Sequence, residues 1–169
     1  MPRHAGFYIP GAVQILIGSP VGPLGAAILI PGLPPGVNFP FIMSGRASDE
    51  FASADRSVDS VTMEVGIDGE GVYVVTFDRS GELTITVMES SFLNIALSLA
   101  HNALTNPQNP LLFTLPVTYN DPFALNKKMT ARSCVIKRPP PMTFSGTAGT
   151  NAWSLMSIDM EINHGARTF

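Results

Sequence analysis

Side chains that could support catalysis or metal binding are present in this sequence, but they are scattered along it. His4, His101 and His164 lie far apart and without the spacing of metal ligands, whereas a zinc site needs ligands that converge. The chain contains no G-x-S-x-G, no H-E-x-x-H and no phosphate-binding glycine loop that opens a helix. We therefore expect no catalytic residue, no metal site and no cofactor, and we predict that the protein is not an enzyme.

The acidic residues also form no convincing reaction centre. Asp159 and Glu161 are two residues apart, the spacing that puts side chains on the same face of a strand. A catalytic pair of carboxylates needs a pocket that separates their pKa values, whereas a solvated strand face needs nothing further. Asp68 and Glu70 lack the other ligands of a calcium loop. We interpret both pairs as surface residues.

The composition indicates a protein covered by neighbours. Only 14% of the residues are charged, against roughly 25% in an ordinary soluble domain, and there are 15 glycines and 15 prolines. Exposed apolar surface usually marks an interaction site. Cys134 is the only cysteine, so no intrachain disulfide forms, the composition fits a reducing compartment, and Cys134 is interpreted as a small apolar filler.

Acidic and basic residues are segregated along the chain. Residues 49–89 contain ten acids and two bases, and residues 90–141 contain one acid and five bases, which are Lys127, Lys128, Arg132, Lys137 and Arg138. No aromatic residues are interleaved with these bases, so nucleic-acid binding by stacking is weakly supported. The segregation is either chance or the basis of head-to-tail self-association, in which a basic face of one copy meets an acidic face of the next.

The N-terminal segment 12–43 carries no charge and is interrupted by prolines and glycines. It is too broken for a transmembrane helix and lacks the features of a signal peptide. We expect two short strands at about 12–18 and 25–30, within an arm or insertion that packs on another subunit. A fusion-type membrane segment is the alternative interpretation.

Alternating residues predict strands over most of the remaining chain. We expect a polar loop over 44–57 and then an antiparallel meander of three strands at 58–67, 71–77 and 82–88, joined by turns at Asp68-Gly69 and Ser80-Gly81. One helix is expected at about 90–104, capped by Ser90 or Ser91 and ended by Asn106-Pro107.

Further strands are expected at 111–119, 129–137 and 153–162. Pro116 places the first of them at an edge or a bulge. In the last strand, Met156, Ile158, Met160 and Ile162 share one face by alternation. The expected fold class is mainly β: an antiparallel β-sandwich or barrel with one packed α-helix, forming a single domain over 1–169.

Several segments resemble the bacteriophage tail tube proteins of contractile-tailed phages, which form the inner tube. The segments follow the family's order over most of the chain, and only the long apolar segment 19–43 departs from it. They are 7–10 (FYIP), 50–55 (EFASAD), 66–70 (GIDGE), 78–81 (DRSG), the helix after 88–91 (MESS), and the ending with 137–140 (KRPP), Trp153 and Gly165.

The resemblance implies a structural virion protein that self-assembles into hexameric rings, which stack into a hollow conduit for genome ejection. In such a tube the inner strands of the subunits join into one continuous barrel, which leaves no open sheet edges. The implied partners are other copies of the chain and the tail sheath, baseplate and tail terminator proteins. Genomic DNA would pass through without specific binding, and no membrane is involved. The implied location is the virion tail, assembled in the cytoplasm of the bacterial host.

A conduit for DNA should present acids and hydroxyls, since proteins hold DNA by neutralising its phosphates with lysine and arginine. We therefore expect polar strand faces to line the lumen, with these residues as candidates: Thr62, Glu64, Glu82, Thr84, Thr86, Asp159 and Glu161. Contacts between subunits are expected at apolar residues of the arm and the following loop: Val13, Ile15, Ile17, Leu24, Ile28, Ile30, Phe41 and Phe51. A secretion-system tube protein is the alternative that shares this architecture, and a membrane-active protein using segment 12–43 is a further one.

Overall fold

The computed structural model describes residues 14–23, 27–33, 39–42, 51–108, 110–121, 124–125, 127–142 and 149–167. The fold is mainly β with one helix, as the sequence predicts. Its elements are β1 (Gln14–Ile17), β2 (Phe41–Ile42), β3 (Ala52–Arg56), β4 (Val61–Val65), β5 (Gly71–Val75), β6 (Gly81–Met88), α1 (Phe92–Leu104), β7 (Leu115–Asn120), β8 (Ala124–Leu125), β9 (Lys128–Arg138), β10 (Thr150–Ser157), β11 (Met160–Asn163) and β12 (Ala166–Arg167).

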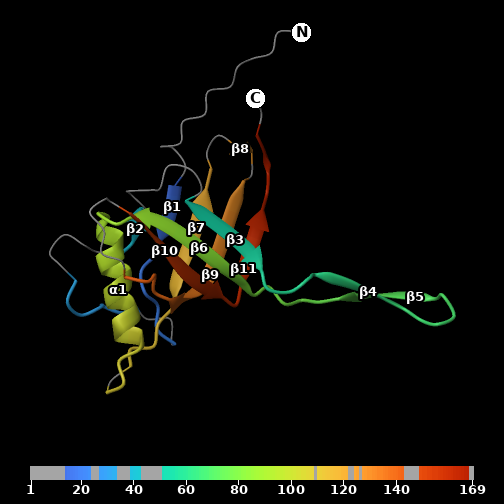
Figure 1. Ribbon diagram of the computed structural model, residues 1–169, viewed down its shortest axis with the longest axis horizontal. Coiled ribbons are helices and arrows are strands. Elements are labelled where there is room, and N and C mark those ends of the chain that lie inside the picture. Colours follow the sequence, from blue (N-terminus) through green and yellow to red (C-terminus); the bar gives the residue numbers. More distant parts are fainter. Residues whose placement is uncertain are drawn as a thin grey trace, which may run out of the picture.

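The main sheet is antiparallel and curled, with the strand order β2-β1-β7-β9-β10-β6-β3. β11 continues the path of β10 and pairs with the first half of β9, whereas β10 pairs with the second half. Figure 1 shows the curled sheet with α1 on one side and the β4–β5 hairpin projecting from the body. β8 and β12 form a separate two-stranded sheet.

One face of the sheet forms the core and the other is mostly polar, with Met156 and Leu16 exposed on it. In β6 the side chains of Leu83, Ile85 and Val87 are buried, whereas those of Glu82, Thr84 and Thr86 are half-buried. This alternation follows from the two-residue period of a strand. The core face packs against α1, which contributes Leu93, Ala96, Leu97 and Ala100.

The helix confirms the expectation from the sequence. Ser91 is the N-cap, and its hydroxyl accepts a hydrogen bond from the backbone N–H of Leu93. The indole N–H of Trp153 donates to the side chain of Asn94 over 2.9 Å. This bond satisfies the polar atom of a core residue and joins the helix to β10.

Pro116 lies at a register shift between β7 and β9, so the expected bulge is confirmed. β7 is nevertheless a central strand, between β1 and β9. The Pro116 carbonyl accepts a hydrogen bond from the Gly18 N–H, just beyond the end of β1, so the missing proline N–H faces a position where the β1–β7 ladder has already ended.

The expected three-stranded meander is wrong. β4 pairs with β5, but β6 pairs with β3 and β10, and in the described chain β5 has no strand partner besides β4. The segment expected to be a loop contains β3, so the hairpin is an excursion between two neighbouring strands of the sheet. At its base the N–H of Ser57 donates to the carbonyl of Ser80. Alternation alone could not reveal this, because it does not specify which strand pairs with which.

The expected face of the last strand is also corrected. An irregularity at Ile158 and Asp159 separates β10 from β11, and the Ser157 hydroxyl bonds the backbone there. Met156 and Ile158 are therefore exposed, while Leu155 and Met160 are buried. Ser157 and Met160 are both buried although they are three residues apart, so one extra residue at this irregularity shifts the two-residue alternation.

The N-terminal segment is part of the subunit's own sheet. β1 pairs with β7 and β2, and the N–H of Val21 donates to the carbonyl of Thr114. Of the second expected strand, the described residues 27–30 form one isolated bridge, at Ala27. The described part of 12–43 therefore pairs within its own subunit, and its packing on another subunit stays a prediction.

Candidate functional site

The polar face of the sheet gathers several of the expected lumen residues. Glu82, Thr84 and Thr86 project from β6, and Ser154 of β10 lies opposite Thr84. The Nζ of Lys137 lies 2.6 Å from one carboxylate oxygen of Glu82. The other carboxylate oxygen accepts a hydrogen bond from the Ser154 hydroxyl. Two hydrogen bonds lower the pKa of Glu82: the one from Lys137 has the larger effect and the one from Ser154 the smaller. Glu82 therefore remains ionised at neutral pH, and Lys137 partly neutralises its charge.

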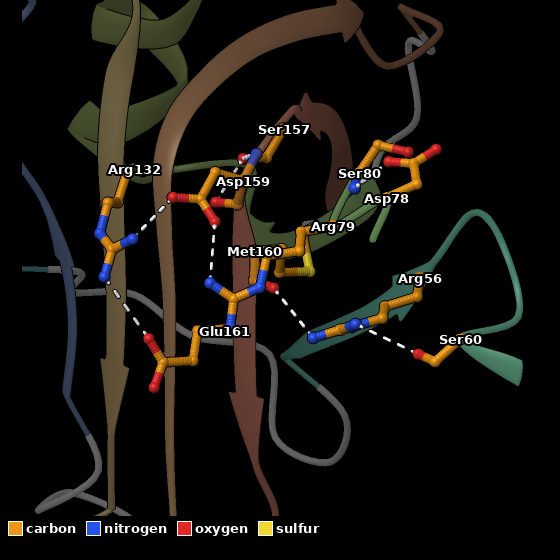
Figure 2. A network of polar contacts seen from close by, with 10 residues as sticks. All are labelled: Arg56, Ser60, Asp78, Arg79, Ser80, Arg132, Ser157, Asp159, Met160 and Glu161. Carbon is orange, nitrogen blue, oxygen red and sulfur yellow. Dashed lines mark hydrogen bonds and ion pairs between the residues drawn. The ribbon is translucent and has the colours of Figure 1, made fainter. Parts of the chain in front are cut away.

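Asp159 and Glu161 share one cation. The guanidinium of Arg132 lies 2.7 Å from Asp159 and 3.5 Å from Glu161 (Figure 2). The hydrogen bond to Asp159 raises the pKa of Arg132 above its already high ordinary value. Glu161 lies opposite Thr130 of β9, next to the buried Met160, so it points to the polar face. The two acids are thus ion-paired surface residues.

Two further arginines connect this cluster to the base of the hairpin. Arg79 lies 3.7 Å from Asp159, and the N–H of Met160 donates to the Arg79 carbonyl. Arg56, at the end of β3, donates to the Met160 carbonyl and to the Ser60 hydroxyl. Figure 2 shows these contacts converging where the chain leaves the sheet for β4 and returns from β5. The cluster therefore anchors the hairpin base to β11.

Thr62 and Glu64 lie on the hairpin, away from Glu82, Thr84 and Thr86. Thr62 is opposite Val74 and Glu64 is opposite Val72. Thr62 and Glu64 were expected to lie beside Glu82, Thr84 and Thr86, and in the monomer they do not. Directly opposed residues in an antiparallel pair share a face. One hairpin face is therefore mixed, while the other carries only apolar side chains and Gly71: Val61, Met63, Val65, Gly71, Tyr73 and Val75.

The hairpin is exposed along its whole length. Every residue of β4 and β5 is exposed, and Tyr73 retains 71% of its accessible surface. Ile67, at the turn, is fully exposed. An isolated two-stranded hairpin is only marginally stable in water, and a contiguous apolar surface marks an interaction site. In the described chain, this exposed apolar surface is the one that most clearly lacks a partner to cover it.

The residues expected at subunit contacts have mixed positions. Ile15, Ile17 and Ile30 are buried in the subunit's own core, and Ile28 packs against it. The role of these candidates in subunit contacts stays a prediction. The ring of Phe51 lies 6.4 Å from that of Tyr119. Val13 and Leu24 lie outside the described residues, and for Phe41 only its strand position is described. Sequence reasoning missed the apolar hairpin face, although its alternation was visible, because a core strand has the same pattern.

Among the grooves on the described surface are two that are defined by their lining residues. The larger, about 540 Å³, lies between α1 and the proline run 139–141, with Trp153 at its floor. The smaller, about 170 Å³, involves β3, the start of β9, and β11.

Neither groove brings together a set of reacting groups. No group of three or more potential metal ligands occurs among the described residues. In the same part of the chain, no helix is long and apolar enough to cross a membrane. Cys134 is buried, and burial raises the pKa of its thiol to about 11.

No protein-family model matches this chain, and no curated protein matches it. Among solved structures, the chain is similar to one in the cryo-EM structure of the anti-feeding prophage cap, described as the AFP tube terminating cap. The two are 9% identical, the alignment covers 98% of this chain and 97% of the other, and the TM-score is 0.55. At this identity the likeness shows the fold alone, which is mainly β.

Proposed function

We propose that this protein is a subunit of a tail tube, which assembles through its own copies into hexameric rings that stack into a hollow conduit. The observation that carries the proposal is the β4–β5 hairpin, whose apolar face the described monomer leaves uncovered. The fold likeness to a tube-terminating cap supports a role in an assembly of this kind.

The reach of the hairpin supports contact with another subunit. An extended strand rises about 3.3 Å per residue, so the chain from Ser57 to Ile67 spans up to about 33 Å. The radius of gyration of a compact chain of this length is about 15 Å. The hairpin is therefore long enough to lie across a neighbouring subunit. Its apolar face would be buried there.

The open edges of the main sheet support joining of subunits into a common sheet. β3 is one end of the strand order and β2 is the other. Open edges invite pairing with another chain, and closure into a barrel removes them. Addition of a strand from a neighbouring copy at the β3 edge would satisfy that edge, and the same contact repeated from copy to copy would close a ring.

The polar sheet face is the proposed lumen wall. It carries Glu82, Thr84, Thr86 and Glu161, and the nearby bases Lys137 and Arg132 are ion-paired with carboxylates. DNA is retained where lysine and arginine neutralise its phosphates. Lysine and arginine side chains that are already paired with carboxylates bind DNA phosphates more weakly. This face therefore suits passage of a genome without specific binding.

Negative-stain electron microscopy of the concentrated, purified protein tests the proposal. We expect rings or hollow tubes of uniform width. Persistent monomers that co-sediment with liposomes would contradict it and favour the membrane-active alternative.

The fold likeness to a terminating cap favours a second candidate, a protein that ends a tube. A cap predicts single rings that do not stack, whereas a tube subunit predicts stacks of variable length. The same micrographs distinguish the two. A phage tail tube and a secretion-system tube would look alike in them. Packaged DNA in particles isolated from the producing cell would identify the phage tail.

A further inference from the structure

The smaller groove lies between two strands that do not pair with each other. β3 and β11 converge where Arg56 donates to the Met160 carbonyl, and they diverge from that point. The groove occupies the wedge between them. Its lining comes from five strands, the segment before β9 and the residue after β11: Ala52, Ser53, Ala54, Leu83, Tyr119, Lys127, Lys128, Met129, Ile162, Asn163 and His164. Its volume of about 170 Å³ is below the range of about 300–1,000 Å³ that small-molecule sites occupy. The enclosed part of the groove therefore suits one side chain of a docked segment, while the rest of such a segment would lie along the strand edges.

The backbone of β3 points into this wedge. In an antiparallel ladder, alternate residues bond to the partner strand and the residues between them point away. The N–H of Thr86 donates to the Phe51 carbonyl, and the N–H of Ser57 donates to the Ser80 carbonyl. The odd-numbered residues of β3 therefore bond to β6. Ala52 and Ala54 direct their backbone groups to the free edge.

The backbone of β11 points into the wedge from the other side. The N–H of Arg132 donates to the Asp159 carbonyl, so Glu161 and Asn163 bond to β9 by the same alternation. Met160 and Ile162 point away from β9, and the N–H of Met160 donates to Arg79. The groove is therefore flanked by two strand edges that both offer backbone groups for pairing.

The charges at the groove match those of the hairpin. Lys127 and Lys128 line the groove, and neither forms an ion pair with a described carboxylate. The distal hairpin carries Glu64, Asp68 and Glu70, and it presents the fully exposed Ile67 at its turn. In the described chain no lysine or arginine pairs with these three acids. An acidic segment with an apolar tip thus complements a basic groove with an apolar floor.

We propose that the groove between β3 and β11 receives the distal half of the β4–β5 hairpin, residues 64–72, from a second copy of this chain. The hairpin adds backbone hydrogen bonds along the open edges, as in strand addition. A molecule's own hairpin is not the occupant, because it leaves the body at the closed end of the wedge and extends away (Figure 1). This inference rests on the proposed self-assembly and names its receiving site.

Reversing charges at the two surfaces tests the pairing. Lys128→Glu and Glu64→Lys should each weaken self-association by about tenfold or more, measured by analytical ultracentrifugation, because each places like charges together. Mixing the two variants should restore association between unlike copies. Arg138→Glu is the matched control: it changes the same charge at the opposite end of β9 and should leave association near the parental level.

A proline substitution tests the strand addition separately. Ala54→Pro removes an N–H that points to the free edge, so the monomer should keep its circular dichroism spectrum and melting temperature within a few degrees. Its association should be weakened at least as much as that of Lys128→Glu. Ile162→Pro makes the same test from β11, so the proposal remains testable if one variant does not fold.

The outcomes separate this inference from the proposed function. If the parent assembles but Lys128→Glu, Ala54→Pro and Ile162→Pro assemble equally well, the receiving groove is overturned and the proposed function stands. Failure of the mixed variants to associate also overturns the groove. If the parent itself remains monomeric at every concentration and salt tested, both proposals fall.

Discussion

Cys134 shows how burial sets the chemistry of a single residue. The thiol is enclosed in the core, its sulfur lies 3.7 Å from the Ala131 carbonyl, and burial raises the pKa to about 11. A thiolate is the reactive form of cysteine. At neutral pH this residue is therefore an inert apolar filler, as its lone position in the sequence indicated.

This burial predicts a loss of stability at alkaline pH. The pKa is higher in the folded protein than the ordinary value of 9.0, so the stabilisation is complete below about pH 9 and is lost as pH rises towards about 11. Between about pH 9 and pH 11 we expect ionisation of Cys134 to lower the free energy of unfolding by about 2 kcal/mol. Denaturant titrations of the parent and of Cys134→Ala measure it. An equal fall in both would contradict the prediction.

The polar sheet face gives a prediction at Thr84, which is half-buried on β6 opposite Ser53 and Ser154. In a Cys134→Ala background, Thr84→Cys should react with a small maleimide in both monomers and tubes. In tubes it should resist a bulky polymer-linked maleimide, because the lumen excludes that reagent. Ser98→Cys, on the exposed side of α1, is the control and should react with both reagents. If Thr84→Cys in tubes reacts equally with the small and the bulky maleimide, its face of the sheet lies on the outer wall of the tube.

At the scale of elements, α1 depends on a local cap and on packing against the sheet. Four side chains of the helix are buried, and the Asn94–Trp153 bond connects it to β10. Isolated helices of this length are marginal in water. The packing therefore provides most of the stability, while the cap determines where the helix begins.

The cap gives a prediction for Ser91. Ser91→Ala removes the acceptor for the Leu93 N–H and should lower the free energy of unfolding by about 1 kcal/mol, which lowers Tm by about 2–4 °C. Ser98→Ala, at an exposed position in the same helix, should leave stability equal or slightly higher, because alanine has the higher helix propensity. Thermal unfolding followed by circular dichroism measures both. Equal Tm values for Ser91→Ala and the parent would refute the role of the cap.

At the scale of the whole molecule, the hairpin contributes surface but little to the core. No residue of β4 or β5 belongs to the core cluster. Replacing residues 59–77 by a short Gly-Ser linker should leave a folded monomer, because the Ser57–Ser80 hydrogen bond at the hairpin base remains. The variant should form no rings or tubes, since the proposed contact to the next copy is gone. Micrographs showing normal tubes would refute the role of the hairpin.

A milder change isolates the apolar hairpin face. Met63→Ser with Tyr73→Ser removes one opposed pair from that face and should raise the concentration needed for assembly by tenfold or more, because burial of apolar surface drives association. Thr62→Ser, on the mixed face, is the control and should assemble like the parent. Light scattering against concentration gives the threshold for each variant.

The sequence alone determined the parts of this protein that depend on neighbouring residues. The helix after Ser91, the strands now seen as β6 and β9, and the bulge at Pro116 follow from local preferences such as capping, alternation and the missing proline N–H. The acids and hydroxyls of the polar face were also visible, because the two-residue period separates them from the core residues.

Only the tertiary structure decided which strands pair and which apolar residues are covered. The same alternation describes Leu83 and Ile85, which are buried, and Val61 and Met63, which are exposed. The irregularity at Ile158 shifted the buried face of the last strand, and the pairing of β1 with β7 placed Ile15 and Ile17 in the core of the monomer. Strand pairing joins residues that are far apart in the chain, so local sequence patterns do not encode it. The unpaired sheet edges and the exposed hairpin are consequences of that pairing.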